Sequence, residues 1–187
     1  MHKGKLFIIS GASGVGKSTV LGKVMAARQD LRFSVSATTR APRQGEQDGV
    51  NYYFVDEQTF RSMIERGELL EHDYHNKTFY GTPRAQLEEK LEHGHVILDI
   101  DPMGAFQVRQ RRPDATLIFI MPPSREELER RLVSRGDTSP EQTRIRLERA
   151  QWEMDQRCKY DHVVVNDQVD ACVEKILNII AQKADEE

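Results

Sequence analysis

Residues 11–18 read Gly-Ala-Ser-Gly-Val-Gly-Lys-Ser and follow directly on the apolar run Leu6–Ile9. The octapeptide matches G-x-x-x-x-G-K-[ST], the phosphate-binding loop that connects a strand to a helix. Its glycines let backbone N–H groups curl around an anion, and the helix that starts at Lys17 directs its positive dipole end at the same oxygens. The stretch therefore predicts an α/β fold that holds the phosphates of a nucleoside triphosphate.

Two side chains of this loop are expected to act on the nucleotide. Lys17 can reach the β- and γ-phosphates as a point charge, and Ser18 offers its hydroxyl to Mg²⁺. Mg²⁺ is thus the expected cofactor, bound together with the triphosphate. The motif does not indicate which phosphate moves, or to which acceptor.

Composition limits the remaining possibilities. The chain has 187 residues and a formal net charge of −3, which fits one core with inserted lobes and argues against a nucleic-acid partner. The two cysteines, Cys158 and Cys172, fit a reducing compartment, and we expect both to be packing residues. No apolar run approaches the roughly 18 residues of a membrane span, and the N-terminus is no signal peptide. We therefore expect a cytoplasmic protein without membrane contact, while the oligomeric state cannot be read from the sequence.

Apolar runs alternate with helical patterns along the chain, which is typical of parallel α/β proteins. The runs are apolar on both faces, as strands covered by helices require. Two helix starts are marked, by the capping box of Ser124 and Glu127 and by Pro140 at a first helical position. The expected strands are Lys5–Ile9, Val96–Ile100, Thr116–Met121 and His162–Val165, and the expected helices are Lys17–Arg28, Met103–Arg112, Arg125–Arg135, Pro140–Cys158 and Val169–Lys183.

Two stretches interrupt this pattern. Residues 33–82 carry the strand signals Phe33–Thr38 and Asn51–Val55 around a turn-prone segment, which predicts a small, mostly β lobe inserted into the core. Residues 131–149 read as an arginine-rich helical hairpin, and we expect residues 125–149 to be a lid. The core then consists of residues 1–32, 83–124 and 150–187 in a single domain.

A pair of arginines marks a candidate phosphate site in the inserted lobe. Arg40 and Arg43 lie three residues apart in a segment that Pro42 stiffens. Two converging guanidinium groups suit a phosphate better than a carboxylate, because they supply several charge-assisted hydrogen bonds. Tyr52 and Tyr80 lie in the same lobe and could each donate a hydroxyl; a merely solvated turn is the alternative.

Two carboxylates, Asp99 and Asp101, end an otherwise apolar strand. Strand alternation predicts that both face the same side, at the sheet end where ligands of open α/β folds bind. Such close like charges require a cation or hydrogen-bond donors between them, unless the residues only cap the strand. Asp101 also begins a D-x-x-G match, but no N-K-x-D follows, so we discount a GTPase.

Three arginines of the helical hairpin suggest a second anion site. Arg131 and Arg135 are spaced i, i+4 on one expected helix, and Arg146 lies on the next. Like charges at this spacing repel, which makes sense if an anion binds between them. Arginines on a mobile segment stabilise charge on a transferred phosphoryl group, although a solvated surface hairpin has the same pattern.

Taken together, these segments resemble the guanylate kinase family over nearly the whole chain. The most specific stretch runs from Ser34 to Glu46 and is close to the family pattern S-V-S-x-T-T-R-x-P-R-x-G-E. Further matches are Leu70-Glu71-His72, Tyr80-Gly81-Thr82, Leu98-Asp99-Ile100-Asp101, Arg135-Gly136 and Val165-Asn166-Asp167. The resemblance implies a three-layer P-loop kinase core with a parallel sheet, a small, mostly β GMP-binding lobe and a helical lid. It also implies ATP-dependent phosphorylation of GMP to GDP, with dGMP as a second acceptor.

The resemblance also implies a role for individual residues. It places the GMP phosphate on Arg40, Arg43, Tyr52 and Tyr80, and guanine on Ser36, Glu71 and Thr82 with Asp99 and Asp101 nearby. It assigns the transferred phosphoryl group to Lys17, Arg135 and Arg146, and the i, i+4 spacing adds Arg131 as a further catalytic candidate. ATP would contact Gly11, Ala12, Ser13, Gly14, Val15, Gly16, Lys17, Ser18, Thr19 and, near adenine, Asn166.

The chemistry of guanine agrees with this assignment. A carboxylate such as Glu71 accepts from the N1 and N2 donors of guanine, while a hydroxyl such as Ser36 donates to O6. Adenine would set an acceptor against the carboxylate and leave buried polar groups unpaired. No general base is required, because the second pKa of a phosphate is about 6.

The chain departs from the family pattern at two places. Pro102-Met103-Gly104 stands where Trp-Gln-Gly or Met-Gln-Gly is common, and Lys77-Thr78-Phe79 replaces Gly-Asn-Tyr before Tyr80. Two other functions stay open at this point. One is a different P-loop kinase, for example one that acts on a ribose phosphate; the other is a guanylate-kinase-like scaffold module that binds peptides.

Overall fold

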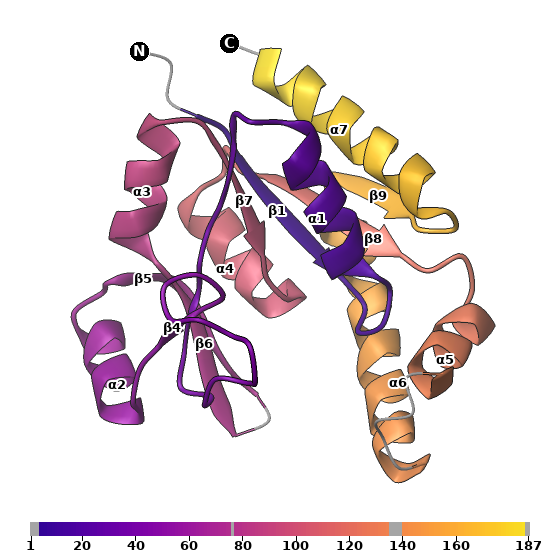
Figure 1. Ribbon diagram of the computed structural model, residues 1–187, viewed down its shortest axis with the longest axis horizontal. Helices are drawn as coiled ribbons and strands as arrows, with labels where there is room; N and C mark the ends of the chain where they lie inside the picture. Colours follow the sequence, from indigo (N-terminus) through magenta and orange to yellow (C-terminus); the bar gives the residue numbers. More distant parts are fainter. Residues whose placement is uncertain (1–3, 76, 135–139, 186–187) are drawn as a thin grey trace. The chain divides into compact units, whose positions relative to one another are not determined.

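The computed structural model describes residues 4–75, 77–134 and 140–185 (Figure 1). The chain folds into two compact units, and each unit combines segments that are distant in sequence. The first unit comprises Met1–Leu6 and Asp30–Ala115, and the second comprises Phe7–Gln29 and Thr116–Glu187.

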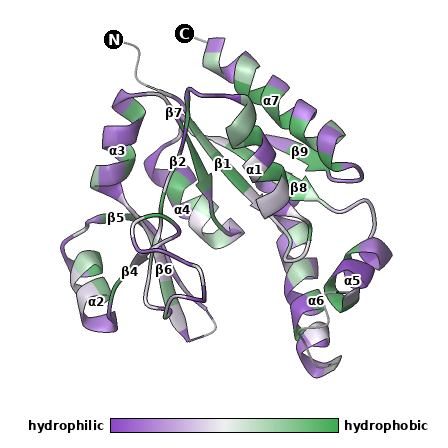
Figure 2. Cartoon of the chain, viewed as in Figure 1, coloured by the Kyte–Doolittle hydropathy of each residue, from purple (hydrophilic) through white to green (hydrophobic). Residues whose placement is uncertain are grey.

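The second unit contains three parallel strands, in which β8 pairs with β1 on one side and β9 on the other. All residues of β1, and all but the last of β8, are buried, and most of them are apolar (Figure 2). The buried polar residues are Ser10 in β1 and Thr116 in β8. Helices α1 and α7 pack against each other. The elements are β1 (Leu6–Gly11), α1 (Lys17–Ala27), β8 (Thr116–Met121), α5 (Arg125–Ser134), α6 (Pro140–Asp155), the 3₁₀ helix η1 (Gln156–Lys159), β9 (His162–Val165) and α7 (Val169–Asp185).

The first unit contains a parallel pair of strands and a separate four-stranded sheet. Strands β2 and β7 are parallel, and the four-stranded sheet has the order β4-β3-β6-β5 with β6 antiparallel to both neighbours. A small core of Ala37, Phe60 and Leu69 lies under this sheet. The elements are β2 (Leu31–Phe33), β3 (Ala37–Thr38), β4 (Tyr53–Phe54), α2 (Glu57–Glu65), β5 (Leu69–His75), β6 (Thr78–Pro83), α3 (Arg84–Glu92), β7 (His95–Asp99) and α4 (Pro102–Arg111).

The parallel strands and helices expected from the sequence are present, with shifted ends. The N-terminal half of the capping box is confirmed, since the Glu127 N–H donates to Ser124 Oγ over 3.1 Å. The segment expected as one strand from Phe33 to Thr38 is divided, because its start pairs with β7 and its end pairs with β6. The second expected strand of the lobe shortens to Tyr53–Phe54. Arg135, the expected last residue of the helix that begins at Arg125, lies outside the described residues.

One prediction about the cysteines is wrong. Cys172 is buried in α7, as expected, but Cys158 is exposed. The helix expected to include Cys158 ends at Asp155, and the chain continues as η1. The tighter 3₁₀ turn changes the angular position of each residue, so Cys158 does not take the position that a continued α-helix would give it.

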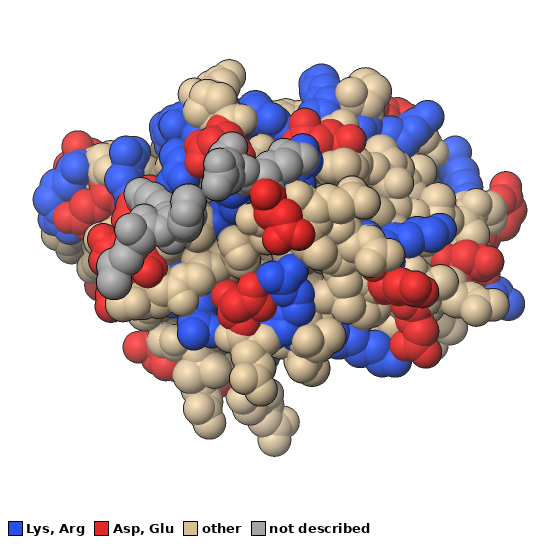
Figure 3. Space-filling view, turned by 90° about the horizontal axis from the view of Figure 1, so that it is seen from above, with Lys and Arg blue, Asp and Glu red and all other residues tan. Residues whose placement is uncertain are grey.

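Two surface features complete the description. Among the described residues, no helix has the length and apolar character needed to cross a membrane. On the face drawn in Figure 3, acidic and basic side chains are interspersed, in keeping with the formal net charge of −3.

Helix α1 offers a direct test of helix propensity. Gly22 is exposed in the middle of α1, and a Cβ added there would meet no atom within 4 Å. Gly22→Ala should therefore raise the free energy of unfolding by about 0.5–1 kcal/mol, because alanine loses less backbone entropy in a helix. Thermal unfolding followed by circular dichroism would measure it, and a lowered Tm would contradict this account of α1.

Candidate active site

The loop between β1 and α1 has the backbone that its glycines predict. Gly14 and Gly16 adopt positive φ angles of 89° and 94°. A Cβ on Gly14 would lie 2.6 Å from Leu132 Cδ2, and one on Gly16 would lie 2.9 Å from Asn166 Nδ2. Both positions thus exclude a side chain on conformational and on steric grounds. The loop therefore has this backbone conformation without a bound ligand.

Two side chains from distant segments hold the loop by its Val15 carbonyl. The Asn166 Nδ2 group donates to Val15 O over 2.8 Å, and Arg131 donates to the same oxygen over 3.2 Å. Arg131 also donates to the carbonyl of Asn166 over 3.3 Å and binds the Glu127 carboxylate through Nε at 2.7 Å. In this structure Arg131 therefore supports the loop, and its contact with a transferred phosphoryl group stays a prediction.

A third support, Glu153, was not predicted from the sequence. Its carboxylate is buried on α6 and accepts from the Ser13 N–H at 3.0 Å through Oε2. Its other oxygen, Oε1, accepts from Arg149 Nε at 3.1 Å. The i, i+4 spacing of Arg149 and Glu153 was a usable signal for that ion pair, but no local pattern indicated the contact with the loop.

The remaining nucleotide-site residues of the second unit are placed as follows. Ser18 and Thr19 are exposed on the first turn of α1, next to the partly exposed Lys17. Arg146 lies partly exposed on α6, and Arg135 lies outside the described residues.

In the first unit, Arg40 is held by a bidentate ion pair. Both of its terminal nitrogens bond Glu46, each over 2.9 Å, and the carboxylate also accepts from the Arg43 N–H at 2.7 Å. The hydrogen bond from Arg40 is the main reason why the pKa of Glu46 falls to about 2. The Arg40 guanidinium lies 5.3 Å from the centre of the Tyr52 ring, and the rings of Tyr52 and Tyr80 are 6.1 Å apart. Of the four predicted phosphate ligands, three are therefore clustered, while the Arg43 side chain is exposed.

A buried carboxylate forms the centre of the predicted guanine site. Glu71 is only 3% exposed, and its Oε1 accepts from the hydroxyl of the fully buried Thr82 at 2.6 Å. These residues are paired across β5 and β6, and the register of β3 with β6, continued by one residue, places Ser36 opposite Thr82. Directly opposed residues of antiparallel strands share a face, so Ser36, Thr82 and Glu71 form one row across three strands.

Burial dominates the ionisation of Glu71. The loss of hydration raises its pKa to about 7, the Thr82 hydrogen bond opposes this, and the nearby Asp101 and Asp73 raise it further. Near neutral pH the carboxyl group is thus poised between a protonated form and an ionised form.

Helix α4 fixes the strand segment on either side of Glu71. Gln107 accepts from the His72 N–H at 3.3 Å and donates to the His72 carbonyl at 2.8 Å. Arg111 donates to the carbonyl of Leu70. The absence of a side chain at Gly104 leaves room for the Glu71 carboxylate, since a Cβ there would lie 2.6 Å from Glu71 Oε2. These contacts join residues about 35 to 40 positions apart, and the sequence held no signal for them.

The two aspartates after β7 do not continue one strand. The strand ends at Asp99, and Asp101 is the N-cap of α4, where its Oδ1 accepts from the Gly104 N–H at 2.9 Å. Pro102 occupies the first position of α4, where a missing N–H costs nothing. The departure at Pro102 is therefore compatible with the helix, and capping accounts for one oxygen of Asp101.

Comparison with known proteins fits this geometry. The guanylate kinase family model matches residues 3–183. The chain is 49% identical over 179 residues to a guanylate kinase of Thermus thermophilus, an alignment that covers 95% of this chain and 81% of that one. It is 46% identical over 180 residues to a guanylate kinase of Oceanobacillus iheyensis, with 96% and 87% covered. The crystal structure of guanylate kinase from Anaplasma phagocytophilum superposes with a TM-score of 0.81 at 34% identity, over 100% of this chain and 89% of that one.

The chain belongs to the guanylate kinase family. It is an enzyme that phosphorylates GMP to GDP with ATP, and it has the P-loop kinase fold of that family. Family membership thus favours the leading prediction over a kinase for a ribose phosphate or a peptide-binding scaffold module.

The second departure from the family pattern also has a structural account. Lys77, between β5 and β6, has a φ of 61°, in the left-handed region that a glycine adopts without strain. Phe79 stacks on Phe60 at 5.2 Å and contacts Tyr74 at 4.5 Å between ring centres. The changed segment therefore places Lys77 in a left-handed turn and keeps an aromatic side chain, Phe79, next to Tyr80.

Gly104 tests whether Glu71 needs its present position. Gly104→Ala should leave the fold intact, because alanine favours the helix, but its Cβ would displace the Glu71 carboxylate. We expect the KM for GMP to rise more than about 10-fold, since a displaced carboxylate leaves buried donors unpaired. Steady-state kinetics would measure the change. Gly22→Ala is the matched control, and an unchanged KM for GMP would show that Glu71 is not held by this contact.

The pKa of about 7 for Glu71 predicts proton release on GMP binding. Only the ionised carboxylate accepts from both guanine donors, so GMP should bind more weakly as the pH falls below 7. At pH 7 about half a proton should leave per GMP bound, whereas the phosphate, with a pKa of about 6, contributes roughly a tenth. Calorimetry in two buffers of different ionisation enthalpy measures this number. A Glu71→Gln variant that released as many protons would contradict the assignment.

Proposed function

We propose that the two substrates divide between the two units, with ATP on the loop of the second unit and GMP on the row of side chains in the first. The observation that carries this proposal is the buried Glu71 carboxylate with Thr82 beside it. An ionised carboxylate only accepts hydrogen bonds, and guanine presents two adjacent donors. Glu71, Thr82 and Ser36 then read the base, with Asp99 and Asp101 nearby.

The GMP phosphate binds Arg40, Arg43, Tyr52 and Tyr80 in this proposal. The clustering of Arg40 with both tyrosine rings supports it. Glu46 holds two terminal nitrogens of Arg40, so the guanidinium is oriented before phosphate arrives. Its unused donors remain available for phosphate oxygens.

ATP binds residues 11–19 with its adenine near Asn166. Among the described residues, the Oδ1 atom of Asn166 is buried without a hydrogen-bond partner, and the residue is only 2% exposed. The amino group of adenine is a donor of the kind that this acceptor needs. Mg²⁺ fits the same site, because the exposed Ser18 hydroxyl suits an ion whose other ligands are phosphate oxygens and water. When bound, the ion neutralises charge on the phosphates.

Catalysis by these residues consists of alignment and charge neutralisation. The GMP phosphate is largely ionised at neutral pH, so the chain needs no general base. Lys17, with Arg131, Arg135 and Arg146, stabilises charge on the phosphoryl group in transfer. Residues 33–82 serve as the GMP-binding lobe and residues 125–149 as the lid, and dGMP is a second acceptor. The two free cysteines support a reducing, cytoplasmic location.

A coupled ADP-release assay across GMP, dGMP, AMP, CMP and UMP tests this proposal. Lys17→Met should lower kcat at least about 100-fold, and Arg40→Met should raise the KM for GMP about 10- to 100-fold with a smaller effect on kcat. Lys23→Met and Arg66→Met, which remove exposed surface charges of the same units, are the matched controls. Equal turnover of AMP, or an Arg40→Met enzyme with an unchanged KM for GMP, would overturn the assignment.

A further inference from the structure

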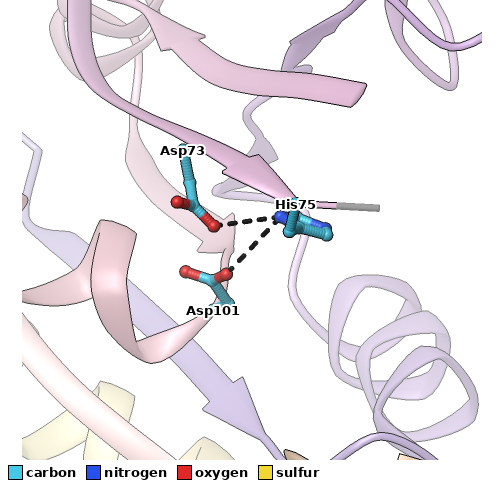
Figure 4. Close-up of side chains that lie close together, drawn as sticks. All are labelled: Asp73, His75 and Asp101. Carbon is cyan, nitrogen blue, oxygen red and sulfur yellow. Dashed lines mark hydrogen bonds and ion pairs between the residues drawn. The ribbon is translucent and has the colours of Figure 1, made fainter. Parts of the chain in front are cut away.

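The side chains of Asp73, His75 and Asp101 converge at the end of β5, and each can bind a metal ion. The proposed reaction uses only Asp101 of the three, near guanine, and gives the cluster no common role. Asp73 and His75 lie on β5, and Asp101 precedes α4 (Figure 4). One ligand atom from each residue lies within 4.8 Å of the other two. His75 Nδ1 is 2.9 Å from Asp73 Oδ2 and 4.0 Å from Asp101 Oδ2.

These separations are close to those around a metal ion. Two atoms bound about 2.1 Å from one ion are about 3.0 Å apart at a right angle and about 3.4 Å apart at a tetrahedral angle. The His75–Asp73 pair already meets this condition. The His75–Asp101 pair would have to close by about 1 Å or less, which a small carboxylate rotation provides.

The surrounding structure orients all three ligands. Asp101 uses Oδ1 to cap α4, so that Oδ2 is the oxygen that faces His75. The His75 imidazole stacks on the Tyr80 ring, with 4.6 Å between ring centres and 11° between planes. Asp73 and His75 share a face of β5 because they are two residues apart. Ligands that are already oriented lose less conformational freedom on binding.

The charge of the cluster also favours a cation. One oxygen each of Asp73 and Asp101 lies within 4.8 Å of the same imidazole nitrogen and of the other. A cation bound between these like charges would reduce their repulsion. An imidazole nitrogen with two carboxylate oxygens is a donor set that suits Zn²⁺, a borderline ion, and Mn²⁺, a harder ion that accepts carboxylate ligands, whereas Mg²⁺ prefers oxygen ligands alone. The side chains are about one-fifth to one-quarter exposed, which leaves room for water to complete the coordination.

We propose that Asp73, His75 and Asp101 form a binding site for a divalent transition-metal ion of the Zn²⁺ or Mn²⁺ type. The site is separate from the Mg²⁺ that accompanies ATP. It joins the end of β5 to the start of α4, the two elements that position Glu71. A bound ion would therefore stabilise the guanine-reading part of the first unit without contacting ATP.

Metal titration of the full-length, nucleotide-free protein tests this proposal, after treatment with a chelator. Co²⁺ serves as the spectroscopic probe and Zn²⁺ as the probe in calorimetry and thermal unfolding. We expect one ion per chain, visible Co²⁺ absorption bands typical of a nitrogen and oxygen site, and a rise in Tm with Zn²⁺.

Variants localise the binding. Asp73→Asn and His75→Gln should each weaken binding at least about 10-fold, while His72→Gln, on the opposite face of the same strand, should bind as the unchanged chain does. His75→Cys should restore binding and add a sulfur-to-cobalt charge-transfer band, which a merely structural effect of His75→Gln would not produce. Absence of binding at millimolar metal, or binding that both Asp73→Asn and His75→Gln leave intact, would overturn the proposal. Because no nucleotide is present, the result does not depend on the assignment of the GMP site.

Discussion

Burying the Glu71 carboxylate constrains the first unit more than any other single interaction. A carboxyl group that is 3% exposed loses its hydration, and its pKa rises to about 7 as a result. Hydrogen bonds from the side chain and the backbone of Thr82 partly offset this loss. In the proposed assignment, the two donors of guanine would use the remaining acceptor capacity of Glu71. The ionised carboxylate would then be favoured when guanine is bound, whereas an adenine base would leave the cost of its burial uncompensated.

Discrimination of this kind requires that Glu71 cannot move to find other partners. Gln107 bonds both backbone groups of the following residue, Arg111 bonds the carbonyl of the preceding one, and Gly104 packs against the carboxylate itself. These contacts all come from α4, whose start is fixed by the Asp101 cap. The helix therefore completes the open edge of β5 and, by the same contacts, restrains the base-reading side chain. The edge of β5 would otherwise be exposed, and its contacts with α4 instead fix the position of the Glu71 side chain.

Sequence reasoning recovered what depends on local chemistry. The phosphate-binding loop needs two left-handed glycines and a helix start, and all of these lie within eight consecutive residues. The pairing of Arg40 with tyrosines, the capping by Ser124 and the parallel strands also left local signals. By contrast, the contacts of Glu153 with Ser13 and of Gln107 with His72 join residues 140 and 35 positions apart. Neither has a periodicity or motif, because side-chain contacts between separate elements depend on how those elements pack. The prediction that Cys158 is buried was wrong for a related reason, because the helix that was expected to include it ends at Asp155.

In the proposed assignment, the two units bind anions in different ways. In the second unit, backbone N–H groups and a helix dipole would face the phosphates, and three side chains hold the loop: Asn166 and Arg131 donate to its Val15 carbonyl, and Glu153 accepts from its Ser13 N–H. In the first unit, the charges sit on flexible side chains, and orientation must come from ion pairing. Glu46 orients these side chains, because its carboxylate accepts hydrogen bonds from both terminal nitrogens of Arg40 and from the backbone N–H of Arg43. The Glu46 carboxylate lowers the net positive charge of this part of the unit, but it fixes the orientation of the Arg40 guanidinium group. For a substrate phosphate that must point its oxygen along one line toward the donor, direction contributes more to catalysis than tightness of binding does.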